Sequence, residues 1–186
     1  MAQRIVNSEQ YESFLIKGGD DGGVLAIRNN GGESSVIFYR PNDTTAYSAN
    51  DAIAANGASH VVFSGLLNEG ADIYITNASL LFESASVPAG MGSFRLHLYN
   101  QTPSGTVDNA AFTMASGDAT KYKGYIEIVS PATVGGNYIY RRNETVNVQV
   151  ALASGESSLY GVLQTLNGWT PAANSQIKLS ISYFPA

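Results

Sequence analysis

Residues 93–112 read SFRLHLYNQTPSGTVDNAAF and combine a strand pattern with an abrupt stop. In the first seven residues Phe94, Leu96 and Leu98 alternate with other side chains, the period of two expected of a strand with one buried face. The Asn, Pro, Ser and Gly that follow are typical of a turn, and DNAAF at 108–112 opens a short apolar segment. The alternation returns at 176–183, QIKLSISY. Two such strands, far apart in sequence, predict a sandwich core built from non-local pairs.

Composition points to the same class of fold. The chain has 186 residues, enough for one domain with a sizeable core, and only 13% of them are charged. The net charge of −5 argues against binding to nucleic acid, which requires clustered Lys and Arg. No cysteine is present, so disulfides and thiolate metal sites are not available. The first residues lack the apolar core of a signal peptide, and no run is apolar enough to cross a membrane, so we expect a soluble protein made in a cytoplasm.

From residue 46 onward the chain contains about eight strand-like runs spaced roughly eight to twelve residues apart. This spacing predicts an all-β domain at 41–186, an antiparallel β-sandwich of jelly-roll type. Before residue 100 only residues 50–57, NDAIAANG, favour a helical turn, with Asn50 as its N-cap and Gly57 as its stop, and a second helical turn is compatible with the polar residues 113–120.

Residues 1–40 have a different character, with three short strand-like runs separated by Gly-rich turns. The pattern predicts a β-meander or arm, which is too small to hold a core by itself. Two interpretations stay open: an extra sheet on the same domain, or an arm that reaches a neighbouring subunit. In the second case, we expect the apolar binding residues to be Phe14, Ile16, Val24, Ile27, Val36 and Phe38.

The residue types that carry chemistry are sparse and scattered. His60 and His97 each lie within a strand pattern, and neither has the spacing of a metal site, so we expect structural roles for both. No nucleophile elbow or phosphate-binding loop is present in the sequence. We therefore predict a protein that is not an enzyme and has no metal or cofactor.

Aromatic residues suggest a different kind of site. Tyr122, Tyr125, Tyr138, Tyr140 and Trp169 are candidates for a sugar-stacking platform. Eleven tyrosines are also expected of an all-β chain, and tyrosine is common at protein interfaces. Core packing, a protein interface and glycan contact all remain open, with Tyr138, Tyr140 and Trp169 as the named candidates for the last two.

Several motifs occur in an order that resembles the capsid decoration, or cement, proteins of tailed bacteriophages. They are DNAAF at 108–112, SLYGVL at 158–163 and TPAANS at 170–175 before the closing strand, and the resemblance covers residues 46–186. It implies a β-sandwich on the exterior of the virion that binds the major capsid protein and stabilises the shell, commonly as a homotrimer. Residues 1–40 lie outside the resemblance, so they are candidates for an added attachment arm. The alternative is a host-recognition or carbohydrate-binding module.

Overall fold

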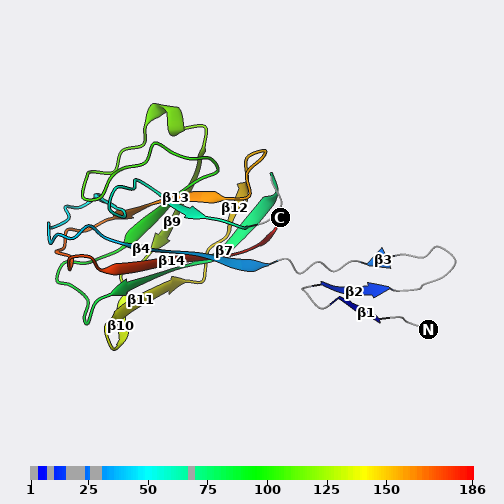
Figure 1. Ribbon diagram of the computed structural model, residues 1–186, viewed down its shortest axis with the longest axis horizontal. Coiled ribbons are helices and arrows are strands. Elements are labelled where there is room, and N and C mark those ends of the chain that lie inside the picture. The colour runs from blue at the N-terminus through cyan, green and yellow to red at the C-terminus, as the bar shows by residue number, and fades with distance from the viewer. Residues whose placement is uncertain (1–3, 8–10, 16–23, 26–30, 67–69) are drawn as a thin grey trace. The chain divides into compact units, whose positions relative to one another are not determined.

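The computed structural model describes residues 4–7, 11–15, 24–25, 31–66 and 70–186, with side chains for 31–66 and 70–186. The chain divides into two compact units, Met1–Gly31 and Gly32–Ala186. Figure 1 shows both units as almost pure β-structure. Each is described by itself below.

The first unit is a three-stranded antiparallel sheet in the order β1-β2-β3. Its strands are β1 (Arg4–Asn7), β2 (Tyr11–Leu15) and β3 (Val24–Leu25). Neighbours in the sheet are also neighbours in sequence, which confirms the predicted meander.

The second unit contains two antiparallel sheets. The first sheet has the order β10-β11-β7-β14-β4, and β12 also pairs with β7. Its strands are β4 (Gly32–Tyr39), β7 (Asp72–Glu83), β10 (Ala132–Gly135), β11 (Tyr138–Asn143), β12 (Val148–Ala151) and β14 (Gln176–Pro185). The second sheet has the order β5-β13-β8-β9, and β6 also pairs with β13. Its strands are β5 (Ala52–Ile53), β6 (Val61–Phe63), β8 (Phe94–Tyr99), β9 (Tyr122–Ile128) and β13 (Leu159–Thr165).

The order in which the chain visits the two sheets makes this unit a jelly roll. From β4 the chain crosses to β5 and β6, returns to β7, and crosses again to β8 and β9. It then forms β10, β11 and β12 in the first sheet, β13 in the second and β14 in the first. The last strand thus lies between β4 and β7 in the first sheet, and β13 lies between β6 and β8 in the second. This is the double Greek-key arrangement, so the predicted jelly-roll sandwich is confirmed.

The core lies between the sheets and is built from alternating residues. Phe94, Leu96 and Leu98 of β8 are fully buried, and β14 contributes Ile177, Leu179 and Ile181 from the opposite sheet. These residues occupy every second position, as a period of two requires when a sheet packs on a second sheet. Both alternations seen in the sequence therefore mark strands that face the same core.

The boundary between the units differs from the expected one by a strand. The sequence suggested that the N-terminal part ends at residue 40, but β4 belongs to the sandwich because it pairs with β14 along its whole length, from Gly32 opposite Tyr183 to Tyr39 opposite Gln176. The backbone pairing of all eight residues of β4 with β14 therefore places the boundary before β4, and not at Pro41 after it.

The helical turn expected at residues 50–57 is not formed. Asn50 has a φ of 73°, and the backbone of residues 50–53 bonds instead to Ala110, Phe112 and β13. Gly57 does have the predicted positive φ, of 74°, but it ends a turn rather than a helix. Non-local pairing with two distant segments has replaced a weak local preference.

Candidate functional site

The predicted apolar residues of the arm divide between the two units. Phe14 lies in β2 and Val24 in β3, at adjacent register positions of the same strand pair. Ile16 and Ile27 lie outside the described residues. Their part in binding stays a prediction.

Val36 and Phe38 lie in β4 rather than in an arm. Phe38 is buried in the sandwich core, so its side chain is not available to a partner, and Val36 is partly buried and packs against the core. The residues between and after them, Ile37 and Tyr39, point the other way and are 55% and 50% exposed. Successive side chains of a strand point to opposite faces of the sheet, so Val36 and Phe38 face the core whereas Ile37 and Tyr39 face outward.

The five aromatic candidates do not form one platform. Tyr122 and Tyr125 lie in β9 of the second sheet, whereas Tyr138 and Tyr140 lie in β11 of the first. Trp169 is only 5% exposed, and its indole N–H donates to Thr165 Oγ1 at 3.2 Å. Trp169 is therefore a core residue, and its ring is not available to a glycan.

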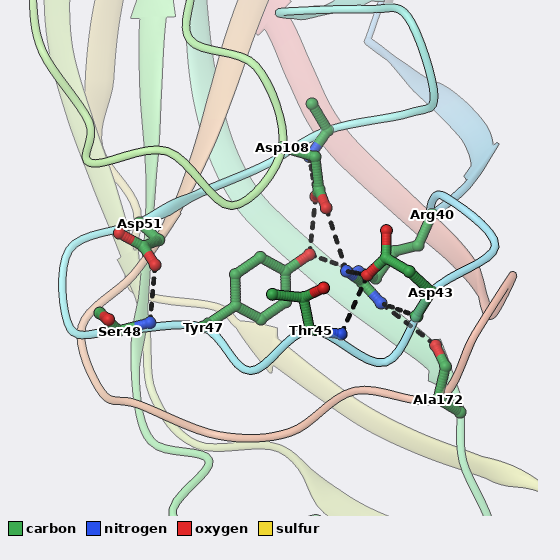
Figure 2. A network of polar contacts seen from close by, with 9 residues as sticks. Arg40, Asp43, Thr45, Tyr47, Ser48, Asp51, Asp108 and Ala172 are labelled. Carbon is green, nitrogen blue, oxygen red and sulfur yellow. Dashed lines mark hydrogen bonds and ion pairs between the residues drawn. The ribbon is translucent and has the colours of Figure 1, made fainter.

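A buried polar cluster ties together loops at one end of the sandwich (Figure 2). The Arg40 side chain is fully buried, and its Nη2 lies 3.0 Å from Asp108 Oδ2. Arg40 Nη1 donates to the backbone oxygens of Asp43, at 3.3 Å, and Ala172, at 3.2 Å. One guanidinium thus connects segments separated by more than a hundred residues in the sequence.

Tyr47 completes this cluster. Its hydroxyl accepts from Arg40 Nε and donates to Asp108 Oδ1 at 2.7 Å, and the same carboxylate oxygen accepts the Ala54 N–H at 3.0 Å. Burial raises the pKa of Tyr47, and the hydrogen bond to Asp108 raises it further. In the sequence, Asp108 was identified only as the first residue of the DNAAF segment, and not as a partner of Arg40. The available signal was the Arg directly after the strand-like run 34–39, because an arginine that becomes buried there needs an anionic partner.

A second polar cluster covers the outer face of the second sheet. His97 Nε2 donates to Gln164 Oε1 at 2.9 Å, its Nδ1 accepts from the Tyr122 hydroxyl at 3.1 Å, and its ring stacks on Phe112 at 4.0 Å. Burial lowers the pKa of His97, and the charge of Arg95 lowers it further, against the opposing effect of Gln164. Phe112, from the segment between β8 and β9, therefore covers part of a face that the alternation alone predicted to be exposed.

A shallow depression lies on the outer face of the first sheet. Its floor is a row of small side chains, Ser180 of β14 opposite Ser79 of β7, and Arg142 of β11 continues the row. The next row, on one side, contains Lys178, Leu81 and Tyr140.

The row on the other side of the depression contributes Asn77 of β7 and Glu33 of β4, both of which are opposite Ser182. The depression thus crosses four strands and is lined by hydroxyls, one amide, a tyrosine ring and charges of both signs. Of the aromatic candidates, Tyr140 lies in its wall and Tyr138 lies one outward position along β11.

Among the residues with described placement, no cluster of three or more His, Cys, Asp or Glu is arranged to hold a metal ion. In the same part of the chain, no helix is long and apolar enough to cross a membrane.

No protein-family model matches the chain, and no curated protein matches it. Among solved structures, it is similar to a chain of the cyanophage Pam1 capsid asymmetric unit, with 11% identity, 90% of this chain and 94% of that chain covered, and a TM-score of 0.34. It is also similar to a chain of the acid-stable capsid of Helicobacter pylori bacteriophage KHP30, with 16% identity, 83% of this chain and 86% of that chain covered, and a TM-score of 0.28. A xylanase of Clostridium thermocellum solved with xylohexaose has 10% identity, with 84% of this chain and 27% of that chain covered, and a TM-score of 0.28. These TM-scores are too low to carry an argument, so the jelly-roll assignment rests on the strand order.

Proposed function

We propose that this chain is a non-enzymatic structural virion protein that binds the exterior of a phage capsid, contacts the major capsid protein and stabilises the shell as a homotrimer. The resemblance of residues 46–186 to decoration proteins supports this proposal. The jelly roll is also compatible with it, because this architecture recurs in viral capsid domains as well as in lectins.

The observation that carries the proposal is the separate three-stranded sheet of Met1–Gly31. Its strands contain four, five and two residues. Strands this short bury little apolar surface by themselves, and within this sheet only the middle strand, β2, is paired on both sides. A neighbouring subunit of the shell supplies both the missing surface and a partner edge. Repeated weak contacts of this kind add up because many copies bind one shell.

A truncated variant comprising residues 32–186 tests the proposal. It begins at Gly32 because a cut at residue 41 removes β4, which pairs with β14, and uncovers the core. We expect the truncated protein to unfold at nearly the same temperature as the full chain, but to sediment no longer with particles of its phage and to lose the trimer in light scattering.

A full-length variant carrying Phe14→Ser and Val24→Ser provides a second, milder test. We expect it to bind particles more weakly, whereas a matched double variant at exposed sandwich positions, Val107→Ser and Val134→Ser, binds normally. A folded 32–186 fragment that still decorates particles contradicts the proposed role of the first unit.

A further inference from the structure

The outer depression of the first sheet has the properties of a ligand site. Ser180 points into it and is only 4% exposed, yet its hydroxyl makes no hydrogen bond with any described residue. The hydroxyl is not among the enclosed side-chain atoms that lack a partner, so it is reached from the depression and can bond to water or to a ligand. A ligand that fills the depression takes the place of water as its partner.

The other lining groups indicate a ligand rich in hydroxyls. Asn77 accepts from Ser182 Oγ at 3.1 Å through its oxygen, and its amide nitrogen has no partner among the described residues. Ser79 and Tyr140 add hydroxyls, and the Tyr140 ring and Leu81 add apolar surface to the same wall. Donors and acceptors beside an aromatic ring match a sugar, which has polar hydroxyls around an apolar ring face.

The charges select the kind of sugar. Lys178 and Arg142 are basic and Glu33 is acidic, so the depression is locally cationic on a chain whose net charge is −5. Lys178 has no ion pair within the described ranges, and Arg142 pairs only with Glu144, an exposed residue, at 3.6 Å. Lys178 is therefore free to bind a carboxylate, and Arg142 can exchange its exposed partner Glu144 for one. An arginine binds a carboxylate with two parallel hydrogen bonds.

We propose that the depression lined by Ser79, Ser180, Asn77, Tyr140, Arg142 and Lys178 binds a saccharide that carries a carboxylate. The sugar ring lies against Tyr140, its hydroxyls bond to the Ser and Asn side chains, and its carboxylate pairs with Lys178 and Arg142. This site lies wholly within Gly32–Ala186, so it does not depend on the proposed capsid attachment through the first unit.

An array of mannuronate, guluronate, glucuronate and sialic acid oligosaccharides, each beside its uncharged counterpart, tests this proposal with the full-length protein. We expect saturable binding of at least one acidic sugar, with the uncharged counterpart at least about tenfold weaker, as loss of a charged hydrogen bond implies. The best binder is then titrated in a calorimeter. Lys178→Met and Arg142→Gln should each weaken it by about tenfold or more.

Two variants distinguish binding in the depression from non-specific attraction of an acidic sugar to positive charge on the protein. Ser180→Leu fills the floor and should abolish binding, whereas Arg141→Gln, an exposed neighbour outside the lining, removes the same charge and should leave it unchanged. The proposal is overturned if no acidic sugar shows saturable binding, if the uncharged sugars bind equally well, or if Ser180→Leu leaves binding unchanged in a folded protein. It is also overturned if the native mass rises with protein concentration and Ser180→Leu abolishes this rise, because a second copy of the chain then occupies the depression.

Discussion

Removal of one charge from the buried cluster should destabilise the sandwich strongly. Asp108→Asn keeps the size of the side chain and an oxygen that can accept from Tyr47 or from the Ala54 N–H. It leaves Arg40, whose side chain is fully buried, without its nearer and only buried anionic partner among the described residues, so that only the half-exposed Asp43 remains at 3.7 Å. The substitution therefore isolates the contribution of the charge from that of packing.

The size of the effect follows from the geometry. At 3.0 Å and an effective dielectric constant of about 20, the attraction between the two charges is on the order of 5 kcal/mol. Arg40 loses this attraction but remains desolvated, and uncoupling a buried pair in this way typically costs about 3–5 kcal/mol. Such a loss is a large part of the roughly 5–15 kcal/mol by which a typical domain is stable.

Urea unfolding at neutral pH measures this loss. Trp169 is the single tryptophan, is buried, and lies 5.1 Å from the Tyr47 ring, so its fluorescence follows the region directly. Asp43→Asn is the matched control. Asp43 lies 3.7 Å from the same guanidinium but is 45% exposed, so we expect its loss to cost less than about 1 kcal/mol.

The outcome that refutes this reasoning is specific. If Asp108→Asn costs no more than Asp43→Asn, the buried pair makes no special contribution, and the loops must be held by packing and backbone hydrogen bonds. A change in the urea dependence of the free energy, rather than in the midpoint, indicates instead that the compactness of one of the states has changed.

Two further predictions concern the second sheet. Burial lowers the pKa of His97 below its usual 6.5, so the unfolded chain binds the proton more readily than the folded protein does. The free energy of unfolding should therefore be constant above about pH 7 and fall as the pH drops through about 6.5, and His97→Asn should flatten this slope in a pH series of urea titrations more than His60→Asn does. Gly161→Ala places a Cβ 2.9 Å from Leu96 Cδ1 and should cost about 1–3 kcal/mol through overpacking. Gly117→Ala meets no neighbour within 4 Å and should cost less than about 0.5 kcal/mol, and equal thermal shifts for the two variants contradict the packing argument.

Local patterns predicted the strands well because the alternation of apolar and polar residues within a strand shows which of its faces is buried. The alternation in Phe94–Tyr99 and in Gln176–Pro185 identified the residues that face the core. The same logic failed at His97, whose polar ring suggested an exposed face. The burial of His97 depends on Phe112, which lies in a loop, and no residue of the strand itself indicates this contact.

The proposed sugar site shows the same limit more clearly. Ser180 and Ser79 are distant in sequence and unremarkable in it, and they become the floor of a depression only because β14 inserts beside β7 in one register. Tyr140 was a candidate from sequence, but its partners were not, and Trp169 was lost from the set once the core enclosed it.

The sequence by itself determined that this protein is all-β, has an N-terminal meander and contains a jelly-roll sandwich, because hydrophobic period and turn chemistry act over a few residues. Tertiary structure decided the boundary at Gly32, the pairing of Arg40 with Asp108 and the residues of the outer depression. Each of these depends on which distant strands become neighbours, and this choice is made by the sum of many non-local contacts rather than by any segment alone.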